Sequence, residues 1–522
     1  MNGAEAIMSA AEIHGSNVCF ANPGTTELAF VAALDTVEGM RPVLGLHENI
    51  CTGAADGWAR MTGEVGLTML HLGVGLSNGL ANLHNARRAH TPIVAIVGDH
   101  PSWHLRNDPP LASDLYGLAT AGTSRAFISS DYDTGSAAYN AAWATARASS
   151  APVALIVRAD DAIREQPVWS TPTDERRAGV WLASEGHHPQ AEKVLEHILR
   201  ADNPALLLGG KALNTSGKHA AQALRSALGL TLFTEAFPAI EHSGVNLPRF
   251  ESLTALTPDK GHGRLSKHDL LVLIGAQDPA AFFADEHGLG RLRPDTTQLV
   301  TACSPTEAAA FLQTMSQYLP PVVRPGGVAA SRRTPPAENT ALDPLTFAGA
   351  LVGLQPEGAI VVDESNTAGD PYRDLLHLAA PHIQMRSTAG SLGFGMAAAI
   401  GAAIAAPQRR IINLQADGAA AYSAQALWTQ AREQLDVTTV LLDNGAYNTV
   451  RTSWRAFSGE ADSCTIRRLS ELREPALDWV SISEGFGVTA TRVNDVQGFR
   501  CALMESFNTA GPHVIVVDLP ES

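Results

Sequence analysis

The sequence predicts three successive α/β domains, each a doubly wound parallel sheet with helices on both faces. The chain has 522 residues, too many for one hydrophobic core, and domains of roughly 100–200 residues make about three. Short aliphatic runs that end in Gly, Asp or His alternate with helical segments, as they do in parallel sheets. A Pro- and Gly-rich segment near residues 320–340 is typical of a linker.

The first predicted domain covers residues 1–165. Strand-like runs are "VCFANPG" (18–24), "TMLHLG" (68–73), "PIVAIVGDH" (92–100) and "APVALIVRAD" (151–160). Between the first three of them, "NICTGAADGWARMTG" (49–63) and "LSNGLANLHNARRA" (76–89) predict helices.

The second predicted domain covers residues 190–320 and the third residues 342–522, with a linker at 321–341. Central strand candidates are "PALLLGG" (204–210), "DLLVLIGA" (269–276) and "TTQLVTA" (296–302). Those of the third domain are "AIVVDES" (359–365), "RRIINLQADG" (409–418), "VTTVLLDNG" (437–445) and "HVIVVDLP" (513–520). The strand–helix rhythm of the first domain therefore returns at the end of the chain.

The composition narrows the class of protein. Hydrophobic residues at 45% and charged residues at 17% are typical of a globular enzyme. A net charge of −16 without a basic stripe argues against a nucleic-acid partner. The five cysteines lack CxxC spacing, and neither a signal peptide nor an apolar run of membrane-spanning length is present. The sequence predicts a cytoplasmic protein.

Asp417 and Asn444 each directly follow a strand-like run of the third domain. With the helical segment between them these runs form a βαβ unit, whose crossover is nearly always right-handed. If the strands are adjacent, their C-terminal ends lie about 5 Å apart, at the crevice where open α/β sheets bind ligands. Carboxylate and amide oxygens suit Mg²⁺, and the turn through Gly418 and Ala419 allows close approach to a diphosphate. The spacing fits equally well a helix cap at Asp417 and a turn at Asn444.

Five blocks of the sequence, in order, carry a family resemblance: "NPGTTELAF", "HENICTGAADGWAR", "LHLGVGLSNGLANLHNARRAHTPIVAIVGD", "GSLGFGMAAAIG" and "ADGAAAYSAQALW". The chain resembles the thiamine diphosphate (ThDP)-dependent enzymes, in the branch of benzoylformate decarboxylase and the acetolactate synthase large subunit. The resemblance implies a pyrimidine-binding, a central and a diphosphate-binding domain. One departure is Ala416, which stands where the family motif has its first Gly.

The resemblance implies ThDP and Mg²⁺ as cofactors. Asp417, Asn444 and the carbonyl of Ala446 would hold Mg²⁺, and Asn366 and Thr367 would face the diphosphate. The backbone of Gly390 would accept a hydrogen bond from the cofactor's 4′-amino group, and Leu392 would force the two rings into a V shape. No flavin-binding pattern is evident in the central domain, so FAD is not expected.

Three residues are candidates for chemistry. By the resemblance, Glu48 hydrogen-bonds the pyrimidine ring; a Glu that opens a helix can also complement the helix dipole. His71 ends a strand and can shuttle a proton near neutral pH, or it is a satisfied histidine at a strand end. Thr25 stands where the family contacts the substrate carboxylate, although it could equally cap the helix that starts near Glu27.

Three departures from benzoylformate decarboxylase bear on the substrate. Phe282 stands at the sequence position where that enzyme has its second active-site His. Arg386 and Ser453 stand at two positions that are aromatic in its substrate pocket. A guanidinium can bind a carboxylate with two parallel hydrogen bonds, so the substrate is expected to be more polar than benzoylformate. A salt bridge at the surface or between subunits is the alternative for Arg386.

The expected activity is decarboxylation of a 2-oxo acid through an ylide and an enamine. The alternatives are an acetolactate synthase-like carboligase and a non-catalytic ThDP-binding protein. In the family, each cofactor lies between the first domain of one chain and the third domain of another. A homodimer or homotetramer is therefore expected, with Glu48 and Asp417 of different chains at one cofactor.

Overall fold

The computed structural model describes residues 1–166, 190–253, 258–283, 290–319 and 340–520. It divides into two compact units. One comprises Met1–Ser170, Thr334–Leu376 and Arg386–Ser522, and the other comprises Thr171–Arg333 and His377–Met385. The first unit thus joins the first and third predicted domains, and the second holds the central one. Residues 321–339 of the predicted linker lie outside the described residues.

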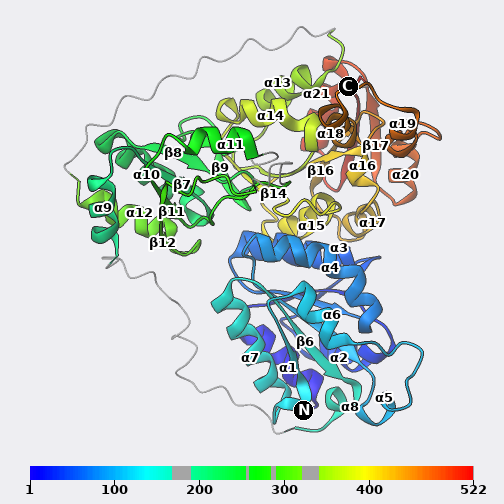
Figure 1. Cartoon of the computed structure of the whole chain (residues 1–522). Helices are drawn as coiled ribbons and strands as arrows, with labels where there is room; N and C mark the ends of the chain where they lie inside the picture. Colours follow the sequence, from blue (N-terminus) through cyan, green and yellow to red (C-terminus); the bar gives the residue numbers. More distant parts are fainter. Residues whose placement is uncertain (167–189, 254–257, 284–289, 320–339, 521–522) are drawn as a thin grey trace. The chain divides into compact units, whose positions relative to one another are not determined.

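The N-terminal part of the first unit contains a six-stranded sheet in the order β2-β1-β3-β4-β6-β5. All its strand pairs are parallel. The strands are β1 (Val18–Asn22), β2 (Arg41–Leu44), β3 (Gly66–Leu70), β4 (Ile93–Asp99), β5 (Arg125–Ile128) and β6 (Pro152–Arg158). The helices are α1 (Gly3–Ile13), α2 (Leu28–Thr36), α3 (Glu48–Thr62), α4 (Leu72–Arg88), α5 (Ser102–Leu105), α6 (Leu115–Gly122), α7 (Gly135–Ser149) and α8 (Ala159–Ile163) (Figure 1).

The C-terminal part of the same unit has parallel strands in the order β17-β18-β16-β15-β13. They are β13 (Ile360–Glu364), β15 (Ile411–Ala416), β16 (Val437–Asp443), β17 (Thr489–Val493) and β18 (His513–Asp518). The helices are α13 (Pro344–Leu354), α14 (Asp370–Leu375), α15 (Gly395–Ala405), α16 (Asp417–Ala420), α17 (Ala426–Arg432), α18 (Asn448–Ser458), α19 (Cys464–Ser470), α20 (Trp479–Gly485) and α21 (Val496–Asn508). The strands predicted for this part of the chain are confirmed.

The second unit contains a five-stranded sheet in the order β10-β8-β7-β11-β12. Its strands, all paired in parallel, are β7 (Pro204–Leu208), β8 (Thr231–Thr234), β10 (Glu251–Ser252), β11 (Leu270–Ile274) and β12 (Gln298–Cys303). Its helices are α9 (Ala191–Arg200), α10 (Thr215–Leu228), α11 (Pro258–Leu265) and α12 (Ala308–Gln317). An antiparallel pair, β9 (Ile240–Ser243) with β14 (His382–Arg386), was not predicted. The three sheets are otherwise parallel, which confirms the predicted fold class.

Local signals in the sequence set several helix ends. Helix α3 begins after His47, whose Nδ1 accepts a hydrogen bond from the Asn49 N–H, and it ends at Gly63 with φ 75°. A glycine at this position adopts the left-handed conformation without steric cost. Helix α13 begins with a capping box at Asp343 and a proline in its first turn. No described helix combines the length and apolar character that a membrane-crossing segment needs.

Helices α3 and α15 pack together through very small residues. A Cβ atom on Gly57 would lie 2.1 Å from the carbonyl oxygen of Ala398, and one on Gly401 would lie 1.9 Å from that of Ala54. The two backbones therefore approach more closely than any larger side chain would permit. This seam joins the N-terminal and C-terminal parts of the first unit.

Candidate active site

Glu48 is the first residue of α3, so its carboxylate also complements the N-terminal end of the helix dipole. Asn78 Nδ2 of α4 donates a hydrogen bond to Glu48 Oε2 at 3.0 Å. A Cβ atom on Gly75 would lie 3.0 Å from Glu48 Oε1, so this glycine leaves room for the carboxylate. The residues near Glu48 in the sequence are largely apolar, and apolar surroundings would favour a protonated carboxyl by desolvation. The structure instead shows a half-buried carboxylate with an amide partner, because α4 carries Asn78 to it.

His71 stands between β3 and α4, where its ring is held from behind by Glu27. The distance from His71 Nδ1 to Glu27 Oε2 is 2.8 Å, and Glu27 is fully buried. The Thr26 hydroxyl donates to Glu27 Oε1 at 2.6 Å and lies 3.2 Å from His71 Nδ1. With Glu27 ionised, Nδ1 carries the hydrogen, and Nε2 remains to exchange a proton with a ligand.

The backbone around this pair fits only small residues. A Cβ atom on Gly24 would lie 2.2 Å from His71 Nδ1, and one on Gly98 would lie 1.7 Å from Glu27 Oε1. Leu72, directly after His71, has φ 51°, which is unusual for a residue with a Cβ. Strained backbone of this kind clusters at functional sites. The loop therefore holds His71 in a costly but defined position.

Thr25 is exposed at the start of a short 3₁₀ turn, Thr25–Glu27. Its neighbour Thr26, which no sequence pattern singled out, reaches His71 instead. Glu27 was also missed as a functional residue. The only local sign of it is an acid three residues after Gly24 of the Asn-Pro-Gly turn. The space for its carboxylate is left by Gly98, which is remote in the sequence.

Asp417 and Asn444 lie side by side, as the spacing predicts. Strands β15 and β16 are adjacent and parallel, with Ala416 opposite Leu442. Asp417 Oδ2 accepts a hydrogen bond from Gly445 N–H at 2.7 Å, and Oδ1 accepts one from Gly418 N–H at 2.8 Å. Asn444 Oδ1 accepts a hydrogen bond from Ala446 N–H at 3.1 Å. The loop after β16 therefore folds around the Asp417 carboxylate.

The donor set fits a hard cation that also binds phosphate. Burial, followed by the neighbouring Asp443, raises the pKa of Asp417 to about 7. A divalent cation would stabilise the ionised form of such a carboxyl. In the described residues no group of three His, Cys, Asp or Glu side chains could hold a metal. A metal here would therefore need amide, backbone and phosphate oxygens, which is the ligand set that Mg²⁺ accepts.

Two predicted diphosphate contacts lie close to this loop. Asn366 and Thr367 are in the 3₁₀ turn Asn366–Gly369 after β13, and Asn366 has φ 50°. Asn448 Nδ2 of α18 lies 3.5 Å from Thr367 Oγ1, while Asn448 Oδ1 is buried without a partner. Gly418 and Ala419 are buried in the single turn of α16. The unsatisfied amide oxygen is a polar group that a ligand or a metal-bound water could satisfy.

Gly390 and Leu392 lie in the segment Ser387–Gly393, between β14 and α15. Gly390 has φ 72° and Gly393 has φ 93°, both in the region that favours glycine. Where the segment meets α15, Glu364 accepts hydrogen bonds from the N–H groups of Gly393, Phe394 and Gly395, at 3.0, 3.1 and 2.8 Å. Burial raises the pKa of Glu364 to about 7, although Gln415 and these N–H groups favour its ionised form.

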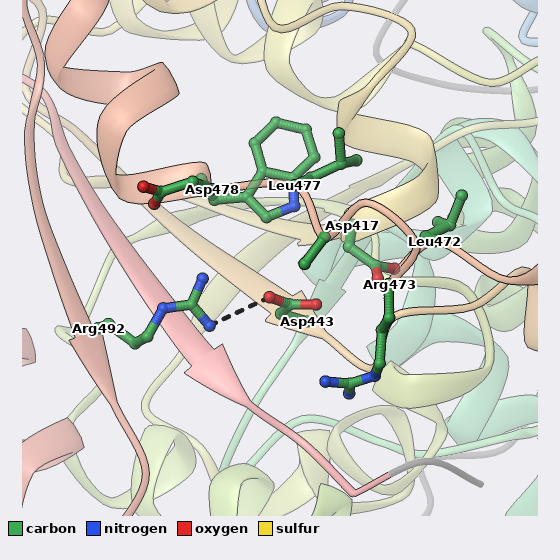
Figure 2. Close-up of a pocket in the computed structure, with 9 residues that line it drawn as sticks. Asp417, Asp443, Leu472, Arg473, Leu477, Asp478 and Arg492 are labelled. Carbon is green, nitrogen blue, oxygen red and sulfur yellow. Dashed lines mark hydrogen bonds and ion pairs between the residues drawn. The ribbon is translucent and has the colours of Figure 1, made fainter.

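A cavity of about 310 Å³ adjoins Asp417 on the side of β17. Figure 2 shows Asp443 between Asp417 and Arg492, and the Arg492 Nη1 to Asp443 Oδ2 distance is 3.2 Å. The other lining residues that Figure 2 labels are Leu472, Arg473, Leu477 and Asp478. The cavity was not predicted, because its lining residues come from separate stretches of the sequence, at 417, 443, 472–479 and 492.

The three predicted substrate-pocket residues lie in different surroundings. Arg386 Nε lies 3.7 Å from Asp363 Oδ2, and Arg60 Nη1 donates to the Arg386 carbonyl at 2.7 Å. Arg386 thus pairs with a buried aspartate of its own chain, and not at the surface or between subunits. Ser453 is on α18. Phe282 belongs to the second unit, where its ring contacts that of Phe237 with centroids 5.0 Å apart.

Comparison with known proteins identifies the family. The model of the N-terminal TPP-binding domain of thiamine pyrophosphate enzymes matches residues 1–114. The model of the C-terminal TPP-binding domain of the same enzymes matches residues 371–517. The chain belongs to the thiamine pyrophosphate enzyme family. Thiamine pyrophosphate and ThDP are the same compound, so the resemblance of the sequence to the ThDP-dependent enzymes is confirmed.

The relatives that the chain resembles are named for two different activities. The chain is 40% identical over 526 residues to IlvX of Mycobacterium tuberculosis, provisionally named an acetolactate synthase large subunit, covering 100% of this chain and 99% of IlvX. It is 29% identical to benzoylformate decarboxylase of Pseudomonas aeruginosa, covering 97% and 95% of the two chains. It superposes on a 4-hydroxybenzoylformate decarboxylase of Rhodococcus jostii RHA1 with a TM-score of 0.83 and 25% identity, over 100% of both chains. It is thus a ThDP-dependent enzyme of the decarboxylase or acetolactate synthase type.

Proposed function

We propose that this enzyme is a Mg²⁺-dependent 2-oxo acid decarboxylase whose substrate is more polar than benzoylformate. The observation that carries the proposal is the pair of Glu27 and His71, with Nδ1 and Oε2 2.8 Å apart. A histidine held in one orientation by a buried carboxylate is suited to deliver a proton at a defined atom. Decarboxylation needs such a proton at the carbon that has lost CO₂.

Each residue then has a defined task. ThDP, when bound, supplies the nucleophilic carbon and the electron sink. Asp417, Asn444 and the Ala446 carbonyl would hold Mg²⁺, while Asn366, Thr367 and the backbone of Gly418 and Ala419 would face the diphosphate. Glu48 donates a hydrogen bond to a ring nitrogen of the cofactor. His71 Nε2 protonates the product carbon, directly or through water, and Thr25 contacts the substrate carboxylate.

The substrate class rests on residues that replace aromatic side chains. Arg386 and Ser453 stand where benzoylformate decarboxylase has aromatic pocket residues, and Phe282 where it has its second active-site His. For Arg386 to meet an anionic group of the substrate, it must exchange its contact with Asp363 for that group. A polar 2-oxo acid, or one with a second anionic group, would give the Arg386 guanidinium a hydrogen-bonding partner in place of Asp363.

The second candidate function is an acetolactate synthase-like carboligation, in which a second carbonyl compound takes the place of the proton. The 40% identity to IlvX over the whole chain favours this candidate. Carboligation and simple decarboxylation differ in the product that they release. A non-catalytic ThDP-binding protein is the third candidate, and the presence of Glu48 argues against it.

A panel of 2-oxo acids separates these candidates. The purified enzyme, loaded with ThDP and Mg²⁺, is incubated with pyruvate, benzoylformate and 2-oxo acids that carry a second carboxylate or a phosphonate. We expect CO₂ and an aldehyde from one of the anionic substrates, and loss of activity when EDTA removes the metal. Acetolactate formed from pyruvate without added flavin would instead support carboligation. On the best substrate, turnover by Glu48→Gln equal to wild type would contradict the role of Glu48.

We also propose a cytoplasmic homodimer or homotetramer with each active site between two chains. Leu46 lies two residues before Glu48, and Val74 lies three residues after His71. In the single chain these two residues are 41% and 49% exposed. Apolar side chains beside a catalytic residue are suited to contact with a second subunit. The cytoplasmic location is supported by five cysteines without a pairing pattern.

A further inference from the structure

Three asparagines connect α3 and α4 through a continuous set of hydrogen bonds. We call Asn49, Asn82 and Asn85 the asparagine ladder. Asn49 Oδ1 accepts from the Asn82 N–H at 3.0 Å, and the Asn49 carbonyl accepts from Asn82 Nδ2 at 2.8 Å. Asn85 Nδ2 donates to Asn82 Oδ1 at 2.9 Å. All three side chains are buried, and Asn82 and Asn85 are completely inaccessible to water.

The ladder continues into the segment Ser387–Gly393 of the C-terminal part. Asn85 Nδ2 donates to the Ser391 carbonyl at 2.9 Å, and Asn82 Nδ2 donates to the Gly393 carbonyl at 3.3 Å. In return, the Ser387 and Thr388 hydroxyls donate to Asn85 Oδ1 and to the Asn85 carbonyl, at 3.3 and 2.8 Å. The segment, which has no helix or strand of its own, is thus hydrogen-bonded at several points.

The side-chain amide groups of Asn82 and Asn85 are fully used. Asn82 Nδ2 has two acceptors and its Oδ1 has one donor, and the same is true of Asn85. Buried polar networks in which every group has a partner favour one arrangement over all others. Gly53 makes room for this network, because a Cβ atom there would lie 2.6 Å from Asn82 Nδ2. The network therefore fixes the segment more precisely than apolar packing would.

We propose that Asn82 and Asn85 are positioning residues that hold Ser387–Gly393 in the shape that accepts the pyrimidine half of ThDP. The proposal rests on the assignment of Gly390 and Leu392 to that half of the cofactor. The N-terminal part of each chain thereby prepares the cofactor segment of its own C-terminal part. Asn85 acts through Ser391, beside Leu392, and Asn82 acts through Gly393. The diphosphate residues around Asp417 are not bonded to the ladder.

Two ligands separate positioning from general stability. Equilibrium binding of ThDP and of inorganic pyrophosphate, each with Mg²⁺, is measured by calorimetry on the full-length protein. In Asn85→Ala we expect the affinity for ThDP to fall about tenfold, a typical effect of losing hydrogen bonds of about 1.4 kcal/mol in total. The affinity for pyrophosphate should stay within about twofold of wild type, because pyrophosphate lacks the pyrimidine ring.

A matched control is Asn140→Ala. Asn140 is on α7 of the same domain, and its Oδ1 lies 2.8 Å from His14 Nε2. Its removal should lower the melting temperature and leave both affinities unchanged. If Asn85→Ala behaves like this control, or if it weakens both ligands equally, the positioning role is refuted.

A milder variant covers the case in which Asn85→Ala does not fold. Thr388→Val removes one hydroxyl that bonds to the ladder and keeps the size of the side chain. We expect a fall of about threefold in ThDP affinity, with pyrophosphate unchanged. An unchanged ThDP affinity in a folded Thr388→Val would also contradict the proposal. Failure of the wild type to bind ThDP would instead contradict the cofactor assignment, which the wild-type titration tests by itself.

Discussion

At the level of single residues, Glu27 and His71 form a pair in which the role of His71 depends on the Glu27 carboxylate. Glu27 is fully buried, and its carboxylate accepts hydrogen bonds from the Gly24 N–H at 2.8 Å and from the Thr26 hydroxyl. The same carboxylate fixes which nitrogen of His71 carries the hydrogen. Without Glu27 the ring can rotate or change tautomer, and Nε2 would no longer be reliably presented to the substrate.

We expect Glu27→Gln to lower kcat by about 10²- to 10⁴-fold, the usual contribution of a positioned acid–base group. His71→Ala should lower kcat by a similar factor. The double variant should be no slower than His71→Ala alone, because residues that act as one unit are not additive. Steady-state kinetics on all three variants checks this, with circular dichroism to establish that each is folded. Additive losses would show that Glu27 and His71 act independently.

The residues with local signals could be predicted, and those set by distant contacts could not. Asp417 and Asn444 follow two predicted strands, so the sequence placed them together correctly. Glu27 becomes a partner of His71 because Gly98, on a strand remote in sequence, leaves space for its carboxylate. No local pattern contains that information. The roles of Thr25, Arg386, Ser453 and Phe282 stay predictions.

At the level of elements, β13 and the N-terminal end of α15 meet at Glu364. Its carboxylate accepts hydrogen bonds from three backbone N–H groups at the start of α15 and just before it. It also accepts one from Gln415 Nε2 at 2.9 Å. Burial nevertheless raises its pKa to about 7 from the ordinary 4.5. Between pH 4.5 and 7 the folded protein therefore binds more protons at this group than the unfolded chain does. The free energy of unfolding must fall as the pH rises through this window.

For the cofactor-free protein, this linkage contributes a loss of roughly 3 kcal/mol between pH 4.5 and 7. Glu364→Gln cannot ionise, so the dependence of its unfolding free energy on pH should be weaker by that amount. Urea unfolding at several pH values measures it in both proteins. Asp417, whose pKa is also raised, contributes equally to both and cancels in the comparison. Parallel pH curves for the two proteins would contradict the assignment.

The strands and helices with strong periodicity were predictable, and the weaker elements were not. The helical segment expected between the strands that precede Asp417 and Asn444 ("SAQALWTQAREQ", 423–434) is helical only in part, because α17 begins at Ala426. The residues between α16 and α17 form separate turns instead of a helix. In one of these turns the Ser423 N–H donates to the Ala420 carbonyl at 3.1 Å. The pair of β9 and β14 was missed because "IEHS" has no apolar pattern and its partner strand lies far along the chain.

At the level of the whole molecule, the proposed dimer has a consequence that two inactive variants can test. Glu48→Gln removes the group that reaches the ring of the cofactor, and Asp417→Ala removes the metal carboxylate. If each site draws Glu48 from one chain and Asp417 from the other, a mixed dimer has one intact site and one doubly altered site. Neither homodimer has an intact site.

Co-expression of the two variants should therefore restore activity to about a quarter of wild type if the chains assort randomly. Each variant alone should have at most about 1% of wild-type activity. Activity of differently tagged chains, purified together, is the measurement. No recovery in verified mixed dimers would show that each chain completes its own site.

The partition of the chain could be predicted only in outline. Composition and rhythm indicated three α/β blocks, and the three sheets agree with them. No pattern in the sequence indicated that the first and last blocks form one compact unit. That union depends on glycines and alanines at particular positions of α3 and α15, whose significance appears only when the two helices are in contact.

The seam between α3 and α15 also limits how this enzyme can evolve. At Gly57 and Gly401 even one added methyl group would collide with main-chain atoms of the opposite helix. A descendant with a new preference for substrates must therefore inherit these two positions unaltered. Its freedom to diversify lies in the loops at the ends of the strands, where side chains can change size without driving the two helices apart.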